Sequence, residues 1–288
     1  MKRPVGIYYA YWVQDWDTDF LPFVDKVKRL GFDLLELHGG ILVTKDRTYR
    51  LKIKEKAEKE GIVLSYGIGV PKDKDLSSLD ENVRQQGIKF MKEVILAIEE
   101  MGGGFISGTV HSYWPATFPK GLTSKEPILK QSIKSMRELA PFAEDHGVTL
   151  NVEVINRFEQ FLINTCEEAL AYIREVNSPA CNILLDTFHM NIEEDSLGGA
   201  IRMAGKHLAA LHLGEPNRKP PGMGRMPWAE IKNALDDIRY TGPLVMEPFI
   251  TQGGSIAQDV GVWRDIVKNP DLDGLAEKAA AFVKAKLR

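Results

Sequence analysis

Four ionisable side chains stand at the ends of four short apolar runs in the second half of the chain. They are Glu153, Asp186, His212 and Glu247, in the segments L-N-V-E-V, N-I-L-L-D, L-A-A-L-H-L and L-V-M-E-P. Runs of this kind are typical of strands that are buried on both faces of a parallel sheet. A charged group at the end of such a strand is costly unless it meets a cation or a hydrogen-bond network. The four residues are therefore candidates for one shared site.

Their spacing places them on consecutive structural units. They are separated by 33, 26 and 35 residues, each about the length of one strand and one helix. Three carboxylates and one imidazole suit Mn²⁺, Mg²⁺ or Co²⁺, whereas zinc usually takes more nitrogen or sulfur. Without a cation, converging carboxylates would repel one another and at least one would protonate. The alternative to a metal site is that each residue forms an ordinary ion pair with a nearby Lys or Arg. This explanation is reasonable for any one of the four residues but poor for all four together.

Alternating strand and helix patterns supply the elements that would position these residues. Apolar runs predict the strands, and amphipathic stretches that stop at glycine predict several of the helices. The predicted strands are 5–11, 32–37, 62–68, 105–110, 148–154, 182–185, 208–213 and 244–249. The predicted helices are 18–30, 47–59, 80–101, 126–146, 165–176, 197–207 and 227–238, with two more near 260–267 and 275–287.

Eight strand–helix units of about 36 residues predict an α/β fold, the (β/α)8 TIM barrel. No linker rich in Pro, Gly or Ser and no break in composition interrupts the 288 residues, so we expect a single domain over 1–288. An additional C-terminal helix would close the ring. In this architecture the active site lies where the C-terminal ends of the strands converge, which is where the four residues would meet.

The composition is that of a soluble globular protein, with 44% hydrophobic residues and a net charge of −3. This balance gives no electrostatic case for binding nucleic acid or an anionic membrane. No apolar run approaches the roughly 20 residues that span a bilayer. The cysteines, Cys166 and Cys181, are too few for a thiolate metal cluster and are expected to be reduced and buried in a cytoplasmic protein.

Further polar and aromatic residues follow the strand ends. Glu159 lies six residues beyond Glu153, and His189 lies three residues beyond Asp186. Arg218 lies six residues beyond His212, where it could bind a substrate oxygen. Solvated loop positions, or a surface salt bridge for Arg218, are the alternatives. Rings crowd the same ends, and some of them could form one wall of a pocket for a small polar ligand.

Nine segments resemble the ketose 3-epimerases, the family of D-tagatose 3-epimerase and D-psicose (D-allulose) 3-epimerase. The match covers almost the whole chain, with departures in 38–45 and 66–74, near barrel loops that bear on substrate preference. The segments are G-I-Y-Y-A-Y-W (6–12), L-G-F-D-L-L-E (30–36), H-S-Y-W-P (111–115), E-V-I-N-R-F-E (153–159), L-D-T-F-H-M-N-I-E-E-D (185–195), H-L-G-E-P-N-R (212–218), P-P-G-M-G-R-M-P-W (220–228), M-E-P-F (246–249) and V-W-R-D (262–265).

The resemblance implies roles for individual residues. One divalent metal ion per subunit, Mn²⁺ or Co²⁺ with Mg²⁺ as a further option, would be held by Glu153, Asp186, His212 and Glu247. Glu153 and Glu247 would also be the catalytic pair. The residues placed on the sugar are Glu159, His189, Arg218, Tyr8, Trp16, Trp114 and Phe249, with Glu36 and His111 less directly involved. A homodimer or homotetramer is implied as well.

The expected reaction is the epimerisation of free ketoses at carbon 3. One glutamate would remove the proton next to the carbonyl and the other would return one to the opposite face, through a metal-stabilised enediolate. The substrate pair stays open among D-tagatose/D-sorbose, D-fructose/D-psicose and L-ribulose/L-xylulose. A metal-dependent aldose–ketose isomerase on the same barrel is the alternative, and a non-catalytic sugar-binding protein that needs no metal is another.

Overall fold

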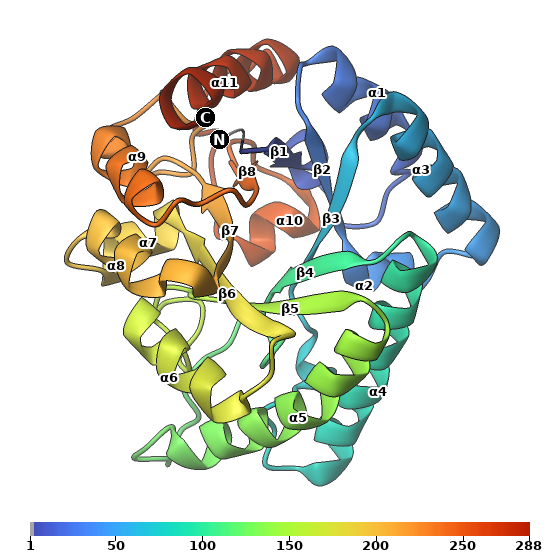
Figure 1. Ribbon diagram of the computed structural model, residues 1–288, viewed down its shortest axis with the longest axis vertical. Helices are drawn as coiled ribbons and strands as arrows, with labels where there is room; N and C mark the ends of the chain where they lie inside the picture. Colours follow the sequence, from blue (N-terminus) through green and yellow to red (C-terminus); the bar gives the residue numbers. More distant parts are fainter. Residues whose placement is uncertain (1–2) are drawn as a thin grey trace.

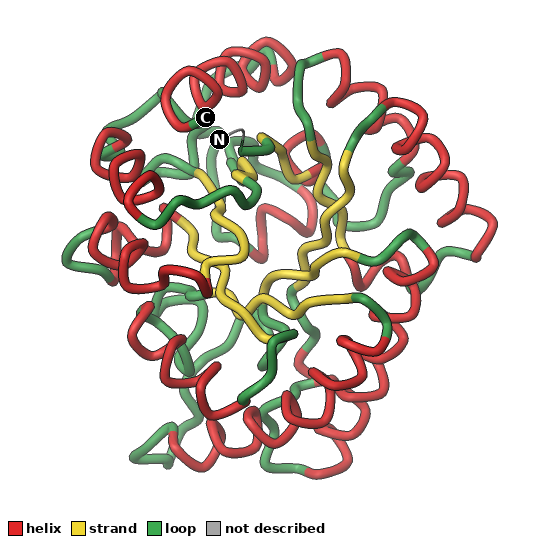
Figure 2. Tube along the Cα trace, viewed as in Figure 1, coloured by secondary structure: helices red, strands yellow, loops and turns green. Residues whose placement is uncertain are grey.

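Eight short strands pair in the order in which they occur along the chain and close into a barrel (Figure 1). Every pair is parallel, and β1 completes the ring by pairing with β8, with Gly6 opposite Val245. Helices surround the barrel as an outer layer (Figure 2). The computed structural model describes residues 3–288 of the chain. The predicted single-domain TIM barrel is confirmed.

The strands are short and almost wholly buried. They are β1 (Val5–Tyr8), β2 (Leu34–His38), β3 (Val63–Ile68), β4 (Gly104–Gly108), β5 (Val148–Glu153), β6 (Cys181–Asp186), β7 (Leu208–Leu213) and β8 (Leu244–Met246). Leu, Ile and Val dominate them because both faces are covered, one by the helices and the other by the barrel interior.

The helices lie between the strands in sequence. Within residues 3–288 they are α1 (Leu21–Arg29), α2 (Gly39–Leu42), α3 (Arg47–Glu60), α4 (Glu81–Glu100), α5 (Glu126–Asp145), α6 (Cys166–Val176), α7 (Thr187–Glu193), α8 (Leu197–Ala204), α9 (Trp228–Asp237), α10 (Gly254–Asp259) and α11 (Leu272–Leu287), with 3-10 turns η1 (Tyr9–Trp12), η2 (Lys72–Lys74) and η3 (Gly205–His207). None of them combines the length and the apolar composition that crossing a bilayer requires.

The two ends of the described chain lie side by side (Figure 1). Arg3 is 4% exposed and donates hydrogen bonds to the carbonyl oxygens of Tyr240 and Leu287 and to the carboxylate of Asp236. These contacts tie α11 to the bottom of β1, so the predicted C-terminal helix does close the ring. Cys166 and Cys181 are free and buried, as predicted.

The largest error of the sequence prediction is the helix near 260–267. The helix in this region is α10, six residues earlier, and the described chain is not helical over 260–267. Gly261 has a φ of 69°, a left-handed conformation that interrupts a helix. The predicted strands 5–11 and 244–249 were too long, because the chain leaves the barrel after Tyr8 and Met246. The short helices α2 and α7 were not predicted.

Candidate active site

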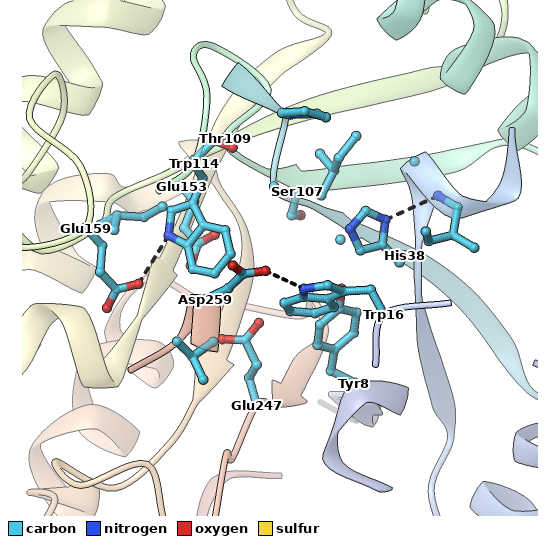
Figure 3. A pocket seen from close by; sticks show the side chains of 18 of the residues that line it. Tyr8, Trp16, His38, Ser107, Thr109, Trp114, Glu153, Glu159, Glu247 and Asp259 are labelled. Atoms are coloured by element: carbon cyan, nitrogen blue, oxygen red, sulfur yellow. Dashed lines mark hydrogen bonds between the residues drawn. The ribbon is translucent and has the colours of Figure 1, made fainter. Parts of the chain in front are cut away.

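A cavity of about 390 Å³ opens at the C-terminal ends of the strands (Figure 3). Of the eleven residues predicted to bind the metal or the sugar directly, ten line it, and the other, Asp186, is fully buried beneath its surface. Figure 3 shows Glu153 and Glu247 pointing into the cavity, with the rings of Tyr8, Trp16 and Trp114 around them. The lining residues from the sequence prediction are Tyr8, Trp16, Trp114, Glu153, Glu159, His189, His212, Arg218, Glu247 and Phe249.

Four side chains meet at the bottom of this cavity. One ligand atom from each of Glu153, Asp186, His212 and Glu247 lies within 4.8 Å of the others. Glu153 and Asp186 are the last residues of β5 and β6, and Glu247 follows β8 directly. Asp186 is paired in register with His212 on β7, so neighbouring strands present both side chains at the same level. The structure therefore brings together the four predicted ligands.

The ring of His212 shows that this cluster fits a cation. Its side chain is 2% exposed, and neither ring nitrogen makes a well-directed hydrogen bond within residues 3–288. Nε2 lies 2.9 Å from Oε1 of Glu36 across the barrel, whereas Nδ1 faces Glu247 at 3.7 Å from Oε1. A carboxylate behind the second nitrogen is the usual support of a histidine that binds a metal. The donor set of oxygens and one imidazole nitrogen suits a divalent ion such as Mn²⁺.

Arg218 supplies a fixed positive charge beside the cluster. Its Nη1 lies 3.1 Å from Oδ2 of Asp186 and 3.1 Å from Oε2 of Glu247. The residue has a φ of 61°, which is rare for a side chain other than glycine. Backbone hydrogen bonds hold this conformation, from its N–H to the oxygen of Glu215 and from the N–H of Phe249 to its own oxygen. Such strain is frequent at functional sites.

The carboxylates do not share the same electrostatic environment. Burial and the nearby charge of Glu247 raise the pKa of Glu153 well above its usual value. Burial also raises the pKa of Asp186. Although burial alone would raise it, the charges of His212 and Arg218 lower the pKa of Glu247. Two glutamates whose pKa values are pushed apart can act as an acid and a base.

Several separate contacts position the polar residues above the cluster. Asp186 caps α7 by accepting the N–H of Phe188 at 2.8 Å, which places His189 on the first turn beside the cavity. Nε2 of His189 lies 3.7 Å from Oε1 of Glu153. Glu159 accepts the indole N–H of Trp114 at 3.2 Å, an interaction drawn in Figure 3. Sugar hydroxyls could bind between these groups.

Asp259 and Asn156 are among the residues at this site that sequence analysis did not find. Asp259 lines the cavity and accepts the indole N–H of Trp16 at 2.7 Å (Figure 3). Asn156 lies behind the cavity wall, within the predicted N-R-F-E segment, and contacts both Glu159 and His189. An asparagine between two predicted site residues was a usable signal, whereas nothing in the local sequence marked Asp259. His111, by contrast, is buried against Tyr172 and does not line the cavity.

The chain matches the xylose isomerase-like TIM barrel family over residues 24–281. It is 43% identical to the D-psicose 3-epimerase of Ruminiclostridium cellulolyticum, over 96% of this chain and 95% of that protein. It is 34% identical to the L-ribulose 3-epimerase of Mesorhizobium japonicum, over 77% of this chain and 74% of that protein. A crystal structure of a D-psicose 3-epimerase with D-tagatose, from Clostridium cellulolyticum H10, superposes with a TM-score of 0.96 at 42% identity and covers 99% of both chains.

Proposed function

The chain belongs to the xylose isomerase-like TIM barrel family and, within it, to the ketose 3-epimerases, and from this membership we propose that it interconverts free ketoses that differ at carbon 3. It is an isomerase. Among the three candidate pairs we favour D-fructose/D-psicose, because identity to a relative named D-psicose 3-epimerase is 43% and to one named L-ribulose 3-epimerase 34%.

The observation that carries this proposal is the meeting of Glu153 and Glu247 in one cavity. They come from β5 and β8, and their ligand atoms lie within 4.8 Å of those of Asp186 and His212. Two glutamates that reach one small cavity from different sides can address opposite faces of a bound sugar, which is what inversion of a carbon centre requires. Their opposite pKa shifts further suit one proton donor and one acceptor.

Each group of residues has its own role in the proposed reaction. Glu153, Asp186, His212 and Glu247 would hold one divalent ion, Mn²⁺ or Co²⁺, which when bound supplies Lewis acidity that makes the proton beside the carbonyl easier to remove. One glutamate accepts that proton and the other donates one to the opposite face, and the two exchange roles in the reverse reaction. Glu159, His189 and Arg218 bind the oxygens of the sugar.

The aromatic residues Tyr8, Trp16, Trp114 and Phe249 enclose the remainder of the sugar. They line the cavity around the glutamates. A sugar bound against these rings would turn its reacting carbon toward the polar cluster. Their rings present apolar surface to the C–H faces of the sugar and exclude water from the site.

The test is turnover of a ketose panel with added Mn²⁺, Co²⁺ or Mg²⁺, run in D2O. We expect a 3-epimer as the product, with solvent deuterium at carbon 3. Glu153→Gln and Glu247→Gln should each abolish turnover with the fold intact. Glu138→Gln, at an exposed position of α5 that pairs with Lys92 far from the cavity lining, serves as the control and should keep turnover. An aldose product would favour an aldose–ketose isomerase. Chelator-resistant binding without turnover would favour a sugar-binding protein.

A further inference from the structure

Asn156 connects two of the residues that line the cavity without lining it itself. Its side chain is 1% exposed and lies where the chain turns away from the end of β5. The amide nitrogen Nδ2 is 2.9 Å from Oε1 of Glu159 and 2.7 Å from Nδ1 of His189. Each of the two amide hydrogens therefore has its own partner.

The orientation of this amide is set by its neighbours. Its oxygen Oδ1 accepts the backbone N–H of Phe158 at 2.9 Å. A flipped amide would place the oxygen against the carboxylate of Glu159 and the NH2 group against the N–H of Phe158. Both contacts would be repulsive, so Nδ2 is the atom that faces His189.

A donor at 2.7 Å decides which nitrogen of His189 carries the proton. Nδ1 must accept, because an N–H there would face the amide N–H at that distance. This disfavours the Nδ1–H tautomer, so the proton of the neutral ring lies on Nε2. Nη2 of Arg218 lies 3.5 Å from Nε2, at the limit of a hydrogen bond. An N–H on Nε2 is therefore repelled by Arg218 much less than an N–H on Nδ1 would be repelled by the amide of Asn156 at 2.7 Å.

We propose that Asn156 is a positioning residue that holds His189 as the Nε2–H tautomer and fixes the carboxylate of Glu159 for the substrate. His189 then donates a hydrogen bond to a sugar oxygen beside Glu153, and Glu159 accepts one from a sugar hydroxyl. The site thus requires a ligand with one oxygen that accepts a hydrogen bond and a neighbouring hydroxyl that donates one, and a ketose has both groups. This inference rests on the proposed function for its substrate, but the tautomer is a property of the protein alone.

The direct test is the tautomer of His189, read by ¹⁵N NMR on protein labelled with [¹⁵N]histidine. Spectra of the metal-free and the Mg²⁺-loaded protein avoid the paramagnetism of Mn²⁺, and His189→Gln assigns the signals. We expect a protonated Nε2 and an unprotonated Nδ1. A ring protonated at Nδ1 in the wild-type protein would overturn the proposal.

Substitution tests whether Asn156 is the cause. Asn156→Asp replaces the amide donor with a carboxylate, so we expect Nδ1 of His189 to become protonated and kcat/KM to fall about 10- to 100-fold. Asn156→Ser, which removes the donor without adding charge, serves if the aspartate variant does not fold, and we expect the Nε2–H preference to weaken. A variant whose tautomer stays that of the wild type would refute the assignment.

Asn164→Asp is the matched control. Asn164 donates to the carbonyl oxygens of Ile155 and Gln160 in the same loop but does not contact His189. Its replacement should lower the Tm and leave the tautomer unchanged. If it changed the tautomer as Asn156→Asp does, Asn156 would have only a general structural role. A wild-type protein that epimerises no ketose would refute the proposed function, and the NMR result would still decide the tautomer.

Discussion

Replacing Glu153 with glutamine should stabilise the metal-free protein. Glu153 is 8% exposed, and its ligand atom lies within 4.8 Å of those of Asp186 and Glu247. At 4.8 Å and an effective dielectric constant of about 20, two like charges repel by about 3.5 kcal/mol. Attraction to His212 and Arg218 offsets part of this, but burial and repulsion dominate, because the pKa of Glu153 is raised.

The net gain in the free energy of unfolding should be about 1–2 kcal/mol, which corresponds to about 2–4 °C in Tm for each kcal/mol. The pH dependence follows from the raised pKa. As the pH rises above the ordinary glutamate value of about 4.3, the unfolded chain loses this proton first, so the metal-free wild type loses stability until the raised pKa is passed. Glutamine has no such loss. The two proteins should therefore converge in acid, and the difference between them should grow as the pH rises toward and past the raised pKa of Glu153.

Added metal should make the wild type more stable than the Glu153→Gln variant. At a hundredfold excess over Kd, a bound ion stabilises the wild type by about 2.7 kcal/mol. Glu153→Gln lacks one charged ligand and should gain much less at the same concentration. The assay is differential scanning fluorimetry from pH 4 to 8, with and without Mn²⁺, using Glu138→Gln as the control. A metal-free variant less stable than the wild type, or one with an equal metal response, would show that the reasoning is wrong.

Three further changes probe the surroundings of the site. Glu36→Gln removes the carboxylate behind His212 and should weaken metal affinity about 10- to 100-fold, measured by calorimetry. Asp259→Asn weakens the hydrogen bond to the Trp16 indole and should raise KM on the order of threefold to tenfold with kcat unchanged. In Gly254→Ala the added Cβ would lie 2.1 Å from a backbone oxygen of the loop after β1, at a φ of 70°, so the Tm should fall and the segment around α10 should become more sensitive to protease.

Much of the barrel could be predicted from the sequence because its signals are local. A short apolar run flanked by a helical pattern indicates a strand wherever it occurs, and the ionisable residue at its end needs no knowledge of distant segments. Once the run of β6 ends at Asp186 and His212 stands one residue before the end of β7, adjacency in a parallel barrel brings these residues level. The four predicted ligands follow from chain order and strand ends alone.

The segment after β8 could not be predicted in the same way. Its position depends on contacts with the loop after β1, where Asp15 accepts hydrogen bonds from the backbone N–H and the hydroxyl of Ser255, 240 residues away. No local pattern encodes such a partner, so the sequence suggested a helix over 260–267 and missed α10 and the cavity residue Asp259.

The sequence by itself thus determined the ring of strands and which side chains stand at its mouth, because hydrophobic periodicity and strand ends are properties of neighbouring residues. Only the tertiary structure decided how those side chains face one another. The contact between Asn156 and His189, the left-handed backbone of Arg218 and the hydrogen bond from Trp16 to Asp259 each depend on contacts between separate segments. Such contacts exist only after the barrel has closed.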